Sequence, residues 1–153
     1  MKHYIRVVPL LMFFALCSFW VVAAEKAPST PDVKAALNAW VEAIETGDVE
    51  KVVALYDKNS TMLSAFAIEP ITSHKGLTEY YKKVVNEPEI SIDVTTQDVR
   101  IFDNVAVNTG LYTFHWVQDG ETMDVPSRFS FVYVLKDGKW AIISHHSSRV
   151  PGK

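Results

Sequence analysis

The sequence predicts an α+β domain in which a curved antiparallel sheet forms a cone and three helices from the N-terminal half pack on its concave face. Three observations support this prediction. Apolar residues repeat at helical spacing in the first half of the chain, and from residue 90 onward they alternate with polar residues, as in strands. Between the last two apolar runs stands Asp137-Gly138, which is a strong hairpin signal. Helices followed by an antiparallel meander are typical of α+β folds.

The first 24 residues are typical of a secretory signal peptide. Lys2 and Arg6 form a positive start, residues 7–22 are mostly apolar, and Val22-Ala23-Ala24 supplies the small residues that signal peptidase requires. We therefore expect cleavage after Ala24, a secreted or periplasmic protein, and no stable membrane anchor. An uncleaved anchor is the alternative, since about 16 apolar residues are marginal for a bilayer core of ~30 Å.

The predicted mature chain is one small acidic domain without cysteine. Cleavage leaves 129 of the 153 residues, which suits one ordinary domain, and removes Cys17, the only cysteine. We therefore expect no disulfide, no thiol nucleophile and no zinc–cysteine site. Loss of Lys2 and Arg6 leaves 13 basic and 18 acidic residues, a net charge of −5 with neutral histidines. Without a basic run, nucleic acid is not an expected partner.

Two helices are predicted at the start of the domain, which we place at residues 31–151 after a polar leader at 25–30. Thr30-Pro31-Asp32 combines a capping hydroxyl, a proline at the first helical position and an acid in the first turn. Gly47 ends the first helix, and Asp48 caps the second. The apolar positions of the first helix form one stripe: Val33, Leu37, Trp40, Val41 and Ile44.

The middle of the chain predicts a third helix and a change to strand periodicity. Residues 57–60 predict a turn, residues 61–66 a short strand, and residues 67–74 a loop. Gly76 is the expected start of the third helix, which Pro88 ends. Residues 105–117 form a long apolar strand in which Gly110 predicts a bulge or a sharp bend.

The register of the final hairpin decides which side chains face the interior. A two-residue loop would pair Leu135 with Trp140, whereas a three-residue loop with a glycine bulge would pair Val134 with Trp140. We prefer the second register because it gathers aromatic residues on the face that a cone buries, although a one-residue slip would reverse one strand. The inner face then carries Phe129, Phe131, Tyr133, Ile143, His145 and Ser147.

The same register leaves apolar side chains on the outer face of the sheet. Apolar groups on both faces indicate that both faces are covered. Helices cover the inner face, and a second subunit is the simplest cover for the outer one, so we predict a homodimer. Its interface would use Val132, Val134, Trp140 and Ile142.

Four short motifs follow one another along residues 46–148. They are Thr46-Gly47-Asp48 between two helices, Leu55-Tyr56-Asp57, Gly76 in a helix start, and DGKW followed by His145-His146-Ser147-Ser148. Their order resembles the nuclear transport factor 2-like superfamily. The chain looks most like small secreted bacterial proteins related to the association domain of calcium/calmodulin-dependent protein kinase II, and like SnoaL-like and SgcJ-like proteins.

The resemblance covers residues 31–151 and implies a cone-shaped α+β barrel that forms a dimer or a larger ring. The superfamily includes isomerases, dehydratases, cyclases and pure binding or assembly modules, so it does not fix an activity. The kinase association domain grips a carboxylate ligand with arginines. The resemblance places those positions at Tyr112, Phe131 and Ser147, with a pocket histidine near Tyr80, and none of these residues is arginine.

His145 is the first candidate for a catalytic group, because an imidazole on the concave face can transfer a proton near neutral pH. Tyr112 could donate a hydrogen bond to a carbonyl oxygen, and Asp57 is the alternative base. The competing interpretations are a core histidine, aromatic core filling and an aspartate that starts a turn. The predicted ligand-binding set is Trp40, Tyr56, Tyr80, Tyr112, Phe129, Phe131, His145 and Ser147.

No metal ion or other cofactor is expected. His145 and His146 are adjacent on a strand, so their side chains point to opposite faces and cannot readily share one ion. We therefore predict an exported domain that binds a small, largely apolar molecule. A proton-transfer enzyme of the isomerase, dehydratase or cyclase type is the alternative, and a structural or assembly module is a third possibility.

Overall fold

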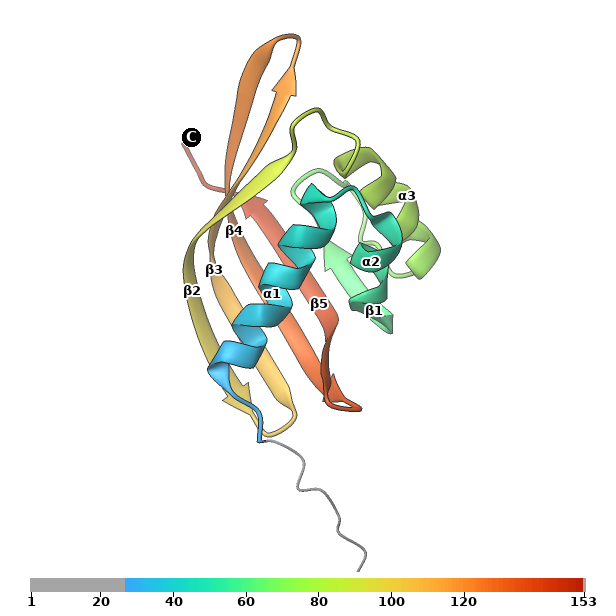
Figure 1. Cartoon of the computed structure of the whole chain (residues 1–153), viewed down its shortest axis with the longest axis vertical. Coiled ribbons are helices and arrows are strands. Elements are labelled where there is room, and N and C mark those ends of the chain that lie inside the picture. Colours follow the sequence, from blue (N-terminus) through green and yellow to red (C-terminus); the bar gives the residue numbers. More distant parts are fainter. Residues whose placement is uncertain (1–26, 153) are drawn as a thin grey trace, which may run out of the picture.

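A computed structural model describes residues 27–152 of the chain (Figure 1). The predicted signal peptide and Cys17 lie outside these residues. The predicted order of helix, helix, short strand, helix and antiparallel meander is confirmed. The elements are α1 (Thr30–Glu45), α2 (Val49–Ala54), β1 (Tyr56–Leu63), α3 (His74–Val84), β2 (Ser91–Phe102), β3 (Val105–Gln118), β4 (Glu121–Lys136) and β5 (Lys139–Arg149).

The five strands form one curved sheet in the order β1-β5-β4-β3-β2, which confirms the predicted fold class. All neighbouring strands are antiparallel except β1, which pairs in parallel with β5 at one edge. Figure 1 shows α1 lying along the concave face, with α2 and α3 beside it toward the β1 edge. The core therefore lies between the sheet and the three helices. No helix within residues 27–152 is long and apolar enough to cross a membrane.

Side-chain caps are present at the starts of α2 and α3, and two predicted positions are wrong. Thr30 is the first residue of α1 rather than its cap, and the cap residue Ser29 makes no side-chain capping hydrogen bond. Asp48 caps α2 by accepting a hydrogen bond from the Lys51 amide at 3.0 Å. In α3 the cap is Ser73, which accepts from the Gly76 amide at 3.1 Å, so the helix begins at His74 rather than at Gly76. The glycine belongs to the first turn, and the cap precedes it.

The turn predicted at residues 57–60 is part of β1 instead. Asp57 does make the expected local contact, because its Oδ1 accepts from the Asn59 amide at 3.0 Å. The register with β5 shifts between Tyr56 and Thr61, and the residues between them have no register partner in β5. The local contact of Asp57 with Asn59 is therefore kept inside an edge strand that bulges here.

The final hairpin has the two-residue loop, so the preferred three-residue register is wrong near the turn. Asp137 and Gly138 both have positive φ angles, 50° and 71°, as a type I′ turn requires, and Leu135 pairs with Trp140. Trp140 packs against the core, and Ile142 is only 1% exposed. Neither residue therefore lies on the outer face, where the dimer interface was predicted.

A bulge at Ile143 restores the predicted pairing farther along the hairpin. Tyr133 pairs with Ile142, but Val132 pairs with Ser144, so one extra residue enters β5. From there on the faces match the prediction, and His145 lies opposite Phe131. The bulge thus corrects the one-residue slip before the strand reaches the candidate site.

The irregularity predicted at Gly110 lies in the neighbouring strand β2 instead, where one extra residue enters next to this position. The register of β2 against β3 shifts between Val94 and Thr96. A Cβ atom at Gly110 would lie 1.9 Å from the carbonyl oxygen of Thr96. Only glycine permits this approach of the two backbones, which helps the sheet to curve.

Candidate functional site

Seven of the eight predicted ligand-binding residues are buried together on the concave face. Trp40 of α1 lies at their centre, with ring centroids 5.2 Å from Phe131 and 5.3 Å from His145. The His145 imidazole stacks on Phe131 at 3.9 Å. We call this set the inner cluster: Trp40, Tyr56, Tyr112, Phe129, Phe131, His145 and Ser147. Tyr80 is half-buried at its border and bonds to Ser64.

A hydrogen-bond chain crosses the inner cluster. The Trp40 indole donates to the Tyr81 hydroxyl at 3.0 Å, the Tyr81 and Tyr56 hydroxyls lie 2.5 Å apart, and the Tyr56 hydroxyl lies 2.8 Å from Nδ1 of His145. Sequence reasoning chose Tyr80 and missed Tyr81. The available signal was spacing, because Tyr81 follows Leu77 by four residues and shares its buried stripe.

The first donor fixes the direction of the first hydrogen bond in this chain. An indole nitrogen can only donate, so the Tyr81 oxygen accepts from Trp40. Oxygen is a better acceptor than the Met62 thioether, which lies 3.3 Å from the Tyr81 hydroxyl. Either hydroxyl of the Tyr56–Tyr81 pair can be the donor, and Tyr81 can instead donate to the Met62 thioether. In the tautomer in which Tyr56 donates to Nδ1 of His145, the imidazole proton lies on Nε2.

Burial keeps the inner cluster uncharged. It lowers the pKa of His145 to about 3, with a further contribution from the neighbouring charge of His146. Burial also raises the pKa of Tyr56, Tyr81 and Tyr112 above the usual value for a phenol. At neutral pH, His145 is therefore a hydrogen-bonding group and a weak base.

Three polar atoms of the inner cluster lack a hydrogen bond of good geometry within the described chain. They are Nε2 of His145, the Tyr112 hydroxyl and the Ser147 hydroxyl. The last two lie near one another, so that Ser147 partly offsets the rise that burial causes in the pKa of Tyr112. The residues that carry the three atoms border a void of about 10 Å³. This volume is on the scale of a single water molecule, so the space predicted as the pocket is almost filled by side chains.

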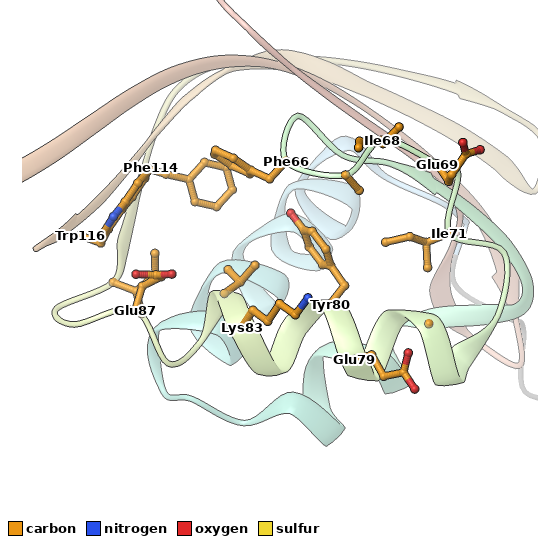
Figure 2. A pocket seen from close by; sticks show the side chains of 14 residues that line it. Phe66, Ile68, Glu69, Ile71, Glu79, Tyr80, Lys83, Glu87, Phe114 and Trp116 are labelled. Carbon is orange, nitrogen blue, oxygen red and sulfur yellow. The ribbon is translucent and has the colours of Figure 1, made fainter. Parts of the chain in front are cut away.

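An open cleft of about 650 Å³ lies beside this void, at the mouth of the cone (Figure 2). The segment before α3 and the helix itself form two of its walls, and β3 contributes Phe114 and Trp116. Apolar side chains dominate the lining: Phe66, Ile68, Ile71, Val84, Ile90, Phe114 and Trp116. The charged residues of the cleft are Glu69, Glu79, Lys83 and Glu87.

Phe66, Tyr80 and Phe114 separate the cleft from the void, because these three residues border both spaces. Phe66 is 42% exposed and lies edge-on to Phe114 and Trp116, at 6.0 and 6.2 Å between ring centroids. Figure 2 shows Tyr80 extending from α3 toward Phe66. Sequence reasoning missed Phe114 and Trp116, although both alternate with Tyr112 and so share its face.

Asp57 is not brought into the inner cluster. Its carboxylate forms an ion pair with Lys136 near the final hairpin turn. The hydrogen bond from Lys136 lowers the pKa of Asp57, and the Asn59 amide adds to this effect. Within residues 27–152, no three His, Cys, Asp or Glu side chains lie close enough together to hold a metal ion.

Comparison with known proteins places this geometry in a family. The family model of the calcium/calmodulin dependent protein kinase II association domain matches residues 29–151. A solved structure assigned to that domain, from Xanthomonas campestris, is 32% identical with a TM-score of 0.77, and the match covers 82% of this chain and 91% of that one. A search of curated proteins finds no match.

More distant solved structures share the fold alone. A dehydratase assigned to the NTF2-like family, from Streptomyces avermitilis, is 18% identical with a TM-score of 0.70, covering 80% of this chain and 96% of that one. A protein from Novosphingobium aromaticivorans assigned as a scytalone dehydratase is 9% identical with a TM-score of 0.71, covering 78% and 83% of the two chains. This fold, with its buried aromatic cluster, is compatible with a ligand-binding or a dehydratase-type domain.

Proposed function

Because this chain belongs to the calcium/calmodulin dependent protein kinase II association domain family and has the NTF2-like fold, we propose that it is a binding domain. Its ligand is a small, largely apolar molecule that occupies the cleft at the mouth of the cone. The cleft, rather than the filled inner cluster, is the binding site in this proposal.

The volume and lining of the cleft are the observation that carries the proposal. Its volume of about 650 Å³ lies within the range of ~300–1,000 Å³ that is typical of small-molecule sites. The aromatic edges of Phe66, Phe114 and Trp116 offer apolar area, while three glutamates and one lysine make the cleft acidic. This charge favours neutral or cationic ligands over anionic ones.

Binding of the neutral dye N-phenyl-1-naphthylamine tests the proposal. We expect saturable binding to the wild-type domain and at least a tenfold weaker affinity for Trp116→Ala, which removes the largest aromatic wall. Trp140→Ala is the matched control, because Trp140 lies by the β4–β5 turn, away from the cleft. Absence of saturable binding, or an equal loss of affinity in both variants, would contradict the proposal.

Proton-transfer chemistry is the second candidate, and one observation favours it. A buried imidazole, His145, lies within hydrogen-bond distance of a phenol, Tyr56. Two observations weigh against it, since burial lowers the pKa of His145 to about 3 and the adjoining void holds about 10 Å³. We therefore rank binding above catalysis.

We also propose a homodimer through the outer face of the sheet. On this face Val105 and Val107 of β3 lie opposite Val134 and Val132 of β4, and all four valines are half-buried in the single chain. The family, an association domain, supports oligomerisation. Sedimentation should detect a dimer at micromolar concentration and a monomer for Val132→Glu. A wild-type monomer would rule out the dimer.

We also propose that the domain is exported. The predicted signal peptide would direct it to the periplasm or the medium, where it would bind its ligand. N-terminal sequencing of protein isolated from cells tests this directly. We expect the mature chain to start at Glu25, and an intact Met1 would contradict cleavage.

A further inference from the structure

Three polar atoms around the void are buried and make no hydrogen bond of good geometry within residues 27–152. Nε2 of His145, the Tyr112 hydroxyl and the Ser147 hydroxyl come from two strands and border the same space. His145 is 3% exposed, Tyr112 1% and Ser147 7%, so bulk water does not satisfy them. Buried polar atoms are normally paired, and three such atoms without a well-formed hydrogen bond around one void indicate a further partner.

The hydrogen-bonding capacity of these atoms indicates which chemical group that further partner carries. In the tautomer in which Tyr56 donates to Nδ1, the imidazole proton lies on Nε2 of His145, and this nitrogen is a donor. The hydroxyls of Tyr112 and Ser147 lie close to one another, and a proton of this pair can rotate toward the void. Among residues 27–152, no charged side chain borders the void. Together they form a neutral pocket of donors, which suits an uncharged hydrogen-bond acceptor.

The position of the void determines the route by which this hydrogen-bond acceptor can enter it. A void of about 10 Å³ admits one heavy atom and not a whole ligand. The larger cleft lies on the other side of Phe66, Tyr80 and Phe114. Phe66 is the most exposed member of this partition and lies in the segment between strand β1 and helix α3. A small movement of Phe66 would join the two spaces.

We propose that the domain binds apolar molecules that carry an uncharged carbonyl group, such as ketones, esters or amides. The carbonyl oxygen occupies the void and accepts hydrogen bonds from His145, Tyr112 and Ser147, while the apolar body fills the cleft. This inference rests on the proposed binding function and narrows its ligand class. A carboxylate is disfavoured, because the donors are neutral and the cleft is acidic.

Three naphthalene probes of similar shape test this inference in a calorimetric titration of the full domain. They are 2-acetylnaphthalene, 2-ethylnaphthalene and 2-naphthoate. We expect the ketone to bind about tenfold more tightly than the ethyl compound, on the scale of one or two added hydrogen bonds. The carboxylate should bind more weakly than the ketone.

Variants that remove a single hydroxyl group test whether the preference for the ketone arises in the void. Tyr112→Phe and Ser147→Ala should each reduce the preference for the ketone several-fold and leave 2-ethylnaphthalene unaffected. Tyr133→Phe is the matched control, because the Tyr133 hydroxyl is also buried and unpaired but does not border the void. Using two independent variants keeps the test valid if one of them folds poorly.

The possible outcomes separate this inference from the proposed function. Equal affinities of the ketone and the ethyl compound in wild type would overturn the inference and leave cleft binding intact, with only water in the void. The same conclusion would follow if Tyr112→Phe behaved like Tyr133→Phe. If none of the three probes bound, the proposed function itself would fail, and the inference with it.

Discussion

The inner cluster and the cleft are two ends of one aromatic surface, and they differ in what fills them. Along β3, Tyr112 stacks near Trp40, with 6.1 Å between ring centroids, whereas Trp116 lines the open cleft. At the inner end Trp40 of α1 packs against the concave face of the sheet and fills the space. At the mouth, no side chain of the described helices fills it. Aromatic residues on a concave face therefore line an open pocket only where no helix side chain fills the space beside them.

The largest expected difference between the inner cluster and the cleft is in the free energy of unfolding lost on truncating a tryptophan. Trp40→Ala should lower the free energy of unfolding by about 3–5 kcal/mol, because it leaves a cavity in a closed core. Trp116→Ala should lower it by under about 1 kcal/mol, since the side chain already borders open space. Urea denaturation of both variants measures the difference. Equal losses would mean that the mouth is as tightly packed as the interior.

The pH dependence of stability sharpens the comparison at His145. Its pKa is lowered from the ordinary value of 6.5 to about 3, so the unfolded chain binds a proton between these values that the folded chain does not. Stability should therefore fall as the pH falls below 6.5, by about 1–2 kcal/mol at pH 5. Denaturant titrations at pH 7, 6 and 5 measure this slope.

His145→Phe is the control for this slope, because a phenyl ring can stack on Phe131 but cannot titrate. The variant should have a flatter profile between pH 7 and 5. Asp48 and Asp57 have lowered pKa values, so their stabilising contributions are lost only as the pH falls below their ordinary value of 3.8. An unchanged slope in His145→Phe would show that the imidazole is not buried in its neutral form.

The smallest expected effect concerns the charge of the cleft. Glu79→Gln should strengthen binding of 2-naphthoate about twofold and leave 2-ethylnaphthalene unchanged, because an exposed charge acts weakly through solvent. Glu50→Gln, an exposed site on α2, is the control. The effect should fade as salt is added. Equal effects of the two substitutions would show that the cleft glutamates do not determine which ligands bind.

Periodicity predicted the element order and most of the inner face, because these depend on local patterns that repeat over many residues. The hairpin register was missed near its turn, since the choice between two loops depends on the φ angles of Asp137 and Gly138. The compensating bulge at Ile143 depends on packing against β4 and has no local signal. Sequence also could not show that Trp40 fills the predicted pocket, because free volume depends on every surrounding element at once.

The indole signals of Trp40 and Trp116 give the most direct test of whether the apolar body of a ligand enters the cleft while Trp40 stays enclosed. In a ¹⁵N-labelled domain titrated with N-phenyl-1-naphthylamine, the Trp116 indole resonance should move. The Trp40 resonance should stay in place, because its N–H is bonded to Tyr81 behind the partition. Movement of the Trp40 signal with a stationary Trp116 signal would contradict the account.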